Sequence, residues 1–276
     1  MDKTYNSLVS HLQNYNFEFF KDEDAYWEWV NDRLLEHSPK LRKQINEYIK
    51  LQEKVTENRS KIDKENFYKH IVSNKLFFEL AHSMKSEIIA TCGLEVASII
   101  KDNAKILDIG CSAGYLSAYY SKIFLNSTID GIDTCKKTIL KAKELHTSYS
   151  NLEFYNDFKL IDEKKYDYVV DTQCLSDIIN EDDLYKIGNN IYKVLKDDGL
   201  LISISALPTA DVCKNFVRLL KSCKLHVKNL DPLIIRNMND TSGYTKLIFT
   251  KNNIDVKFDI DDYYLKLLKH IGRGNF

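Results

Sequence analysis

The feature that most constrains this fold is an apolar run that ends in an acid and breaks into a glycine-containing turn. Residues 105–109 read Lys-Ile-Leu-Asp-Ile, and Gly110 and Gly114 follow with the small Ser112 between them. Glycine permits backbone bends and close approaches that side chains prevent. From Tyr115 onward apolar residues recur at helical spacing, so the turn opens a helix with free N–H groups. The pattern predicts a buried strand, a tight turn and a helix, a layout suited to binding a nucleoside-like cofactor.

The acid in this run separates two classes of cofactor. A dinucleotide places its pyrophosphate over such glycines, where the carboxylate of Asp108 would repel the phosphates. An anion there suits a cofactor with cationic ammonium and sulfonium groups. Residues 108–114 resemble motif I of the class I S-adenosylmethionine-dependent methyltransferases, which often reads acid-x-Gly-x-Gly-x-Gly; serine replaces the middle glycine here. The resemblance implies S-adenosylmethionine as cofactor, bound around Asp108, Gly110, Cys111, Ser112 and Gly114.

Two further segments continue the resemblance in register. Residues 127–133 read as a second strand ending at Asp133, about 20 residues beyond the turn, where a carboxylate can accept both ribose hydroxyls. Residues 152–158 read as a third strand and its exit loop. In similar proteins the matching acid, here Asp157, bonds the adenine amine and the next residue, here Phe158, packs on the ring. Each acid also fits the alternative of a helix cap or turn residue.

A fourth landmark follows in the family's order. Residues 166–171 form the next predicted strand, and residues 172–178 resemble the motif IV loop that lies beside the transferred methyl group. Thr134 and Thr172 complete the cofactor-binding residues that the resemblance implies. The joint pattern favours the family more than any single landmark does.

The reaction of this family asks little of the protein's own side chains. A sulfonium methyl group is already activated, so the protein aligns the acceptor, excludes water and, where needed, removes a proton. Asp177 in the motif IV loop is a candidate general base, with helix capping as the alternative. His70 and His82 are candidates if the N-terminal region closes over the pocket, and structural histidines otherwise.

Glycine usage divides the chain. All nine glycines occur at or after Gly93, and the only proline before it is Pro39. Residues 1–92 are therefore poor in helix breakers and are expected to form a helical region serving as a lid or a dimerisation surface. Helices are predicted over residues 22–38, 41–58 and 63–84, followed by a segment over 85–100. Residues 93–276 are predicted to form the S-adenosylmethionine-binding domain. On this division, the first 92 residues contribute little to the cofactor site.

The remaining chain alternates strands and helices. Helices are expected near 135–147, 182–196, 209–223 and 261–270, with a fifth strand over 200–204. Two consecutive strand-like runs, 225–235 and 244–251, are joined by a loop over 237–243 and leave no room for a crossover helix, so we expect an antiparallel hairpin. The fold class is α/β, a seven-stranded, mostly parallel, doubly wound sheet with an antiparallel terminal hairpin, as in the resembled family.

Composition narrows the partners. The 276 residues carry a net charge of −1, a balance that argues against nucleic acid as partner. No apolar stretch reaches the roughly 20 residues needed to span a bilayer, and the first residues lead into no signal-peptide core, so a cytoplasmic protein is expected. Six cysteines without a CxxC pair are read as free thiols, and no metal site is predicted.

Missing motifs restrict the acceptor. No Asn/Asp-Pro-Pro-Tyr run follows the fourth strand, which disfavours methylation of base or glutamine amides, and no Pro-Cys pair supports a covalent cysteine mechanism. O- or N-methylation of a small molecule is the leading prediction. A peptide or protein acceptor is the first alternative, and RNA ranks below both. A nicotinamide-dependent oxidoreductase and a non-catalytic binding subunit are rivals from other functional classes, and the chain is a possible homodimer.

Overall fold

Aliphatic runs buried on both faces pair into one sheet, as Ile106, Leu107 and Ile109 of the central strand illustrate. The strands are β1 Lys105–Ile109, β2 Thr128–Ile132, β3 Leu152–Tyr155, β4 Tyr166–Thr172, β5 Leu195–Ser205, β6 His226–Asn237 and β7 Asp240–Thr250. This computed structural model describes the whole chain except residues 1–2, 36–42, 44–45, 48, 52, 55–62, 64–65, 68–70, 72–74, 162–164, 179, 239, 254–255 and 273–276.

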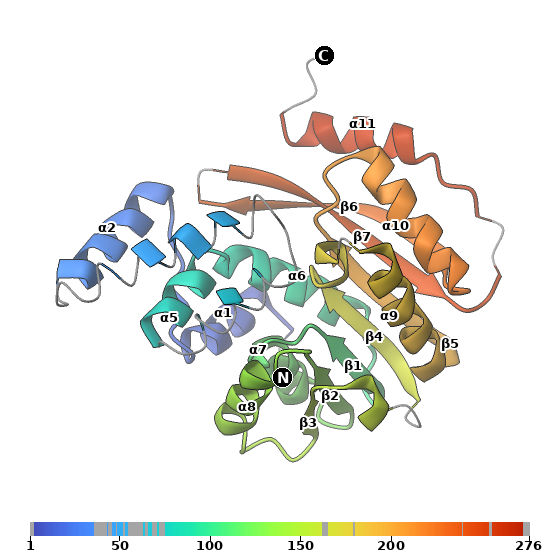
Figure 1. Ribbon diagram of the computed structural model, residues 1–276, viewed down its shortest axis with the longest axis horizontal. Coiled ribbons are helices and arrows are strands. Elements are labelled where there is room, and N and C mark those ends of the chain that lie inside the picture. Colours follow the sequence, from blue (N-terminus) through green and yellow to red (C-terminus); the bar gives the residue numbers. More distant parts are fainter. Residues whose placement is uncertain are drawn as a thin grey trace.

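The strand order of the sheet is β3-β2-β1-β4-β5-β7-β6 (Figure 1). β1 to β5 run parallel, and β7 pairs antiparallel with both β5 and β6. This arrangement confirms the predicted fold class. Because β1 pairs with β2 on one side and β4 on the other, the direction of winding reverses between β1 and β4. Ligands of open α/β sheets bind at the carboxyl ends of strands at such a reversal.

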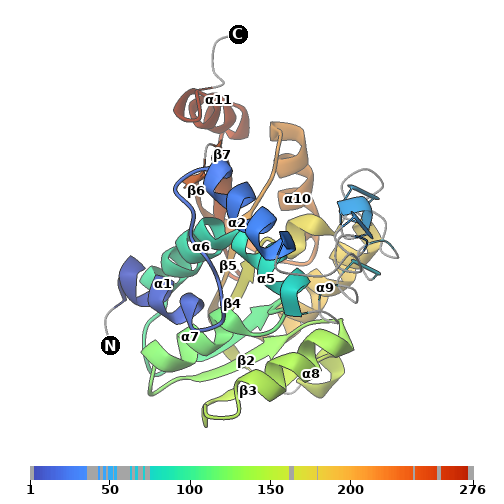
Figure 2. The same cartoon turned by 90° about the vertical axis from the view of Figure 1, so that its left-hand side faces the viewer.

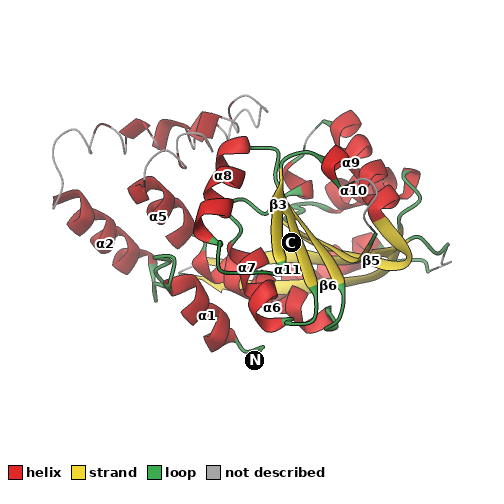
Figure 3. Ribbon diagram, turned by 90° about the horizontal axis from the view of Figure 1, so that it is seen from below, coloured by secondary structure: helices red, strands yellow, loops and turns green. Residues whose placement is uncertain are grey.

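Helices cover both faces of the sheet. The predicted helices after β2, β4, β5 and β7 are confirmed as α8 Lys136–Leu145, α9 Glu181–Val194, α10 Ala210–Ser222 and α11 Ile260–His270. The helix that opens after the first turn is α7 Tyr115–Ile123, and α6 Ser86–Ile99 precedes β1. Helices α6 and α7 lie on one side of the sheet and α9 and α10 on the other (Figure 3).

The terminal hairpin extends beyond the rest of the sheet. Pairing of β5 with β7 ends at Ser205↔Thr245, whereas β6 and β7 continue for five more pairs, from Leu233↔Tyr244 to Asn237↔Asp240. The loop predicted over 237–243 is therefore wrong: most of it is strand, and the chain reverses at Met238, where φ is +55°. The extension, called the ribbon below, passes over α6 toward the N-terminal helices (Figure 1).

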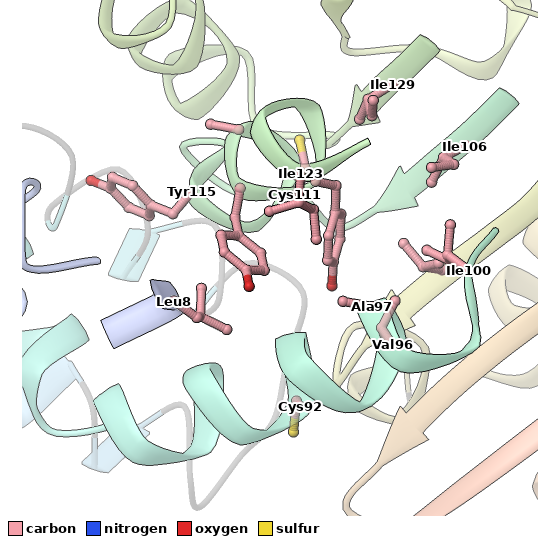
Figure 4. Close-up of a cluster of buried hydrophobic side chains, with 14 of the residues drawn as sticks. Leu8, Cys92, Val96, Ala97, Ile100, Ile106, Cys111, Tyr115, Ile123 and Ile129 are labelled. Carbon is pink, nitrogen blue, oxygen red and sulfur yellow. The ribbon is translucent and has the colours of Figure 1, made fainter. Parts of the chain in front are cut away.

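The first helix, α1 Tyr5–Gln13, belongs to the core of the sheet. Leu8 and Leu12 are fully buried and lie in one apolar cluster with side chains of α6, α7 and β1. Figure 4 shows Leu8 gathered with Val96 of α6 and Tyr115 of α7. Packing therefore joins parts of the chain on both sides of residue 92, although the predicted division at that residue stays a prediction.

The other N-terminal helices form a separate apolar cluster, called the outer cluster below. The predicted helices over 22–38 and 63–84 are represented by α2 Glu23–Leu35 and α5 Lys75–Ser83, which stand in front of the strands in Figure 2. The buried members are Tyr26, Val30, Ile71 and Leu80. Met238 of the ribbon packs against them, and Asn237 Nδ2 donates to the carbonyl of Met84 at 3.1 Å. Most of the helix predicted over 41–58 lies outside the described residues.

Candidate functional site

The turn after β1 passes through three residues in the left-handed conformation. Their φ angles are +69° at Gly110, +51° at Ser112 and +80° at Gly114. Only glycine enters this region without steric conflict, so Ser112 carries local strain where the resembled motif has a glycine. The backbone has the shape that the motif's glycines permit.

The two glycines make room for neighbouring parts of the protein. A Cβ atom at Gly110 would lie 2.4 Å from Cβ and Sγ of Cys174, and one at Gly114 would lie 2.4 Å from Cζ of Phe154. These atoms belong to the loop after β4 and to β3, so the glycines let the first turn pack against the other segments of the site. Contact of the two glycines with a cofactor stays a prediction.

Asp133 joins the first turn to the turn after β2. Its Oδ2 accepts from the Ser112 N–H at 3.1 Å, and its Oδ1 accepts from the Cys135 N–H at 2.8 Å. Burial raises the pKa of this carboxyl, although the two N–H donors oppose the rise. A carboxylate can accept about four hydrogen bonds, so Asp133 can also accept from a ligand hydroxyl. The side chain is therefore placed and equipped to hold a diol at the carboxyl edge of the sheet.

Asp108 lies beneath the turn. Its side chain is 3% exposed, and Ser117 Oγ of α7 donates to its Oδ2 at 2.5 Å. Burial raises its pKa to about 7, against the opposing effect of the Ser117 hydrogen bond. A cation near this carboxyl would stabilise its charged form and lower its pKa again.

The other residues predicted to bind the cofactor differ in how deeply they are buried. Cys111 is buried, and Thr134 is exposed. Asp157 is exposed and caps the short 3₁₀ helix η1 Phe158–Leu160, because its Oδ1 accepts from the Lys159 N–H at 3.0 Å. Phe158 is half-buried against the core on the α9–α10 side of the sheet. The cap that sequence analysis left as an alternative for Asp157 is thus present.

Sequence analysis missed the role of Asp171, the acid near the end of β4. This residue is fully buried; its Oδ1 accepts from the N–H groups of Cys174 and Leu175 at 2.8 and 2.9 Å. Its Oδ2 accepts from Ser203 Oγ of β5 at 2.6 Å. Burial raises its pKa to about 6, with these hydrogen bonds opposing the rise. Asp171 therefore holds the motif IV loop on the sheet, and an acid before a polar turn was the available sequence signal.

Two hydroxyls of the same loop are buried and unpaired. Thr172 Oγ1 and Ser176 Oγ are buried without a hydrogen-bond partner in the described part of the chain. An unpaired buried hydroxyl costs roughly 1–3 kcal/mol. A bound polar group that pairs with them would recover that energy, so the predicted cofactor residue Thr172 fits a polar ligand at the end of β4.

The candidate bases come from different elements. Asp177 is exposed at the end of the 3₁₀ helix η2 Leu175–Asp177. His82 of α5 is half-buried, with its ring centroid 5.3 Å from that of Phe17 and 5.6 Å from that of Tyr115. His70 lies outside the described residues.

The N-terminal helices border the site from α5 and α6. His82 packs on Tyr115, the first residue after the left-handed turn. Gln173 of the motif IV loop directs its Nε2 at Cys92 Sγ of α6, at 4.0 Å. The turn and the loop therefore each contact these helices.

Within the described ranges, no group of three or more His, Cys, Asp or Glu side chains is arranged to hold a metal ion. No helix among those residues is long and apolar enough to cross a membrane. All six cysteines are described, and each is a free thiol.

Comparisons with known families point to one reaction. A family model described as a methyltransferase domain matches residues 100–260. A second model, described as protein-L-isoaspartate(D-aspartate) O-methyltransferase, matches residues 36–155.

Individual relatives share part of the chain. The 235L protein of Invertebrate iridescent virus 6, assigned by name to the methyltransferases, is 34% identical over 100 residues, which cover 34% of this chain and 35% of that protein. The ubiquinone biosynthesis O-methyltransferase of Pelagibacter ubique is 32% identical over 105 residues, covering 36% and 40%. The chain thus spans well under half the length of these curated relatives.

A solved structure shares the fold. The 1,6-didemethyltoxoflavin-N1-methyltransferase of Burkholderia thailandensis, solved with 1,6-didemethyltoxoflavin and S-adenosylhomocysteine bound, has a TM-score of 0.50 at 14% identity. The alignment covers 61% of this chain and 80% of that one.

Proposed function

Because this chain belongs to the class I S-adenosylmethionine-dependent methyltransferase family, we propose that it transfers the methyl group of S-adenosylmethionine to an oxygen or nitrogen atom of a small molecule. The observation that carries the proposal is the position of Asp133. Its carboxylate lies at the carboxyl edge of the sheet, beside the reversal between β1 and β4, and is bonded to the left-handed turn. This is the site at which α/β folds bind ligands.

The residues divide the cofactor between them. The ribose hydroxyls pair with Asp133, and the adenine lies by Asp157 and Phe158. The cationic amino-acid end lies over the turn, where Asp108 supplies a negative charge beneath it. Thr172 offers its unpaired hydroxyl to the same ligand. When bound, the cofactor supplies an activated methyl group.

The rest of the chain orients the acceptor and excludes water. The outer cluster and the ribbon tip meet through Asn237 and Met84, while α5 and α6 contact the turn and the motif IV loop. A wall formed by these helices would hold a small acceptor away from solvent. Asp177 and His82 are the described candidates for removing a proton from it. The similarity to the ubiquinone biosynthesis O-methyltransferase supports a small-molecule acceptor.

A protein carboxylate is the second candidate acceptor. The isoaspartate O-methyltransferase model covers residues 36–155, which include the turn, Asp133 and the helices beside them. Labelled S-adenosylmethionine offered with a set of small phenols and carboxylic acids, and separately with isoaspartyl peptides, distinguishes the two: methyl incorporation into the peptides alone would contradict the small-molecule proposal.

Calorimetry on the full chain tests the cofactor assignment. S-adenosylhomocysteine is expected to bind and NADH is not. Asp133→Ala leaves ribose hydroxyls unpaired, so affinity falls about tenfold or more. Asp259→Ala is the matched control, since Asp259 accepts from a backbone N–H at the start of α11, and its affinity stays at the wild-type value. Equal affinity in both variants would remove Asp133 from the site.

A further inference from the structure

Two buried histidines bond to carbonyl groups of the cofactor turn. His146 Nε2 lies 2.8 Å from the carbonyl oxygen of Ala113, and His11 Nε2 lies 2.9 Å from that of Tyr115. A carbonyl oxygen can only accept, so each Nε2 carries a proton and donates it. Burial lowers the pKa of His11 to about 4 and lowers that of His146 as well, which keeps both rings neutral near neutral pH.

The orientation of His146 is fixed by the segment after α1. Tyr15 places its hydroxyl 3.2 Å from His146 Nδ1. Because Nε2 already carries the proton, Nδ1 accepts from this hydroxyl. The imidazole also packs on the turn itself, since its Cδ2 lies 3.1 Å from where a Cβ of Gly114 would stand. His146 therefore contacts two consecutive residues of the turn.

Ring contacts support the same arrangement. The ring centroids of Tyr15 and Phe17 lie 5.0 and 4.9 Å from that of Tyr115. These side chains come from the segment after α1 and from the start of α7, about 100 positions apart in the sequence. The turn is thus braced by residues that the family's cofactor motifs do not include.

We propose that His146 and His11 are positioning residues that hold residues 112–115 in the conformation that binds the cofactor, so that the first helix forms part of the cofactor site. The inference rests on the proposed function for the identity of the ligand. Without the two donors, the carbonyls of Ala113 and Tyr115 turn toward other partners, and the strained left-handed backbone at Ser112 relaxes. This proposal runs against the expectation that the first 92 residues contribute little to that site.

Paired variants of His146 in the full chain test the proposal. His146→Leu removes the donor, and we expect S-adenosylhomocysteine to bind about tenfold more weakly by calorimetry. His146→Gln places an amide nitrogen where Nε2 stood and recovers most of the affinity. His270→Leu is the control: His270 bonds the carbonyl of Lys266 at 2.7 Å on α11, and its loss leaves affinity unchanged. Equal affinity of the Leu and Gln variants would overturn the donor role.

Two further measurements keep the test decisive. If His146→Leu fails to fold, Tyr15→Phe keeps the ring but removes the hydroxyl, and a severalfold weaker affinity is expected; an unchanged affinity overturns the proposal. If the wild-type chain binds no S-adenosylhomocysteine, the proposed function fails separately. Amide exchange over residues 112–118 then decides the holding role, because faster exchange in His146→Leu or Tyr15→Phe than in His270→Leu supports it and equal exchange contradicts it.

Discussion

Two buried acids of the site, Asp171 and Asp108, differ in the number of hydrogen bonds that they accept. Asp171 accepts two backbone N–H groups and one hydroxyl, whereas the bond described for Asp108 is that from Ser117. Hydrogen bonds to a carboxylate favour its charged form. Burial raises the pKa of Asp108 to about 7, with the charges of Asp171 and Asp133 adding to the rise, and burial raises the pKa of Asp171 to about 6. Asp108 is the acid poised to change its charge when a cation arrives.

We predict that S-adenosylmethionine binding at about pH 7 releases a proton from Asp108. The free carboxyl is partly protonated there, and a nearby cation lowers its pKa, so affinity rises as the pH increases from about 5 to 7. The pKa of this acid in the folded protein lies above its ordinary value of 3.8, so the free energy of unfolding falls as pH rises through the same range. Calorimetry in buffers of different ionisation enthalpy measures the proton.

Asp108→Asn is the control for this linkage. The amide cannot ionise, so the dependence of the binding enthalpy on the buffer should shrink toward zero in the variant. An equal buffer dependence in both proteins would assign the released proton to another group.

Among the elements, the ribbon connects the sheet with the N-terminal helices. It leaves the sheet beyond Ser205↔Thr245 and ends where Asn237 bonds the carbonyl of Met84 and Met238 packs on the outer cluster. A two-stranded ribbon alone is marginally stable in water, so its tip and the helices stabilise each other. The hairpin that closes the sheet also supports the wall of the proposed acceptor site.

We predict that Asn237→Ala loosens the outer cluster and leaves the central strands unaffected. The variant loses one hydrogen bond to the Met84 carbonyl, at a cost of roughly 1 kcal/mol, so amide exchange in α5 should be faster, with β1 and β4 unchanged. Asn229→Ala removes an exposed asparagine from the same strand, whose Nδ2 donates to Asp231, and should alter neither. Unchanged α5 exchange in Asn237→Ala would mean that the tip does not support the helices.

The molecule as a whole is joined by its first helix. Leu8 and Leu12 of α1 are fully buried in the same cluster as α6, α7 and β1. A helix that shares a core with the sheet unfolds with it. The outer cluster, by contrast, meets the rest of the protein through the ribbon and through the contact of α5 with Tyr115 of α7.

We predict that Leu12→Ala lowers the stability of the sheet itself. Truncation of a fully buried leucine costs roughly 2–5 kcal/mol, and thermal unfolding should remain one transition at a lower temperature. Leu265→Ala, at a position 60% exposed on α11, should change it little. Two separate transitions, the higher one at the wild-type temperature, would show that α1 unfolds independently of the sheet.

The elements that could be predicted from the sequence are those specified by residues close together in the chain. The strand, turn and helix around Gly110, the alternation that follows, and the antiparallel hairpin were all readable because the hydrophobic period and the turn residues lie within a few positions of each other. The contacts of His146 with Ala113 and of His11 with Tyr115 join positions 33 and 104 apart. No local signal marks such pairs. The start of β7 at Asp240 was not predicted for a related reason. Polar residues in a ribbon pair across strands, although their composition resembles that of a loop.

The packing of α1 on α7 also has a consequence in time. During synthesis the apolar face with Leu8 and Leu12 is made first, yet its partners on α7 follow about 100 residues later. At about 5–20 residues per second, that delay is roughly 5–20 seconds. Throughout it the nascent helix lacks these partners on α7, and the left-handed turn that it braces has not yet been translated.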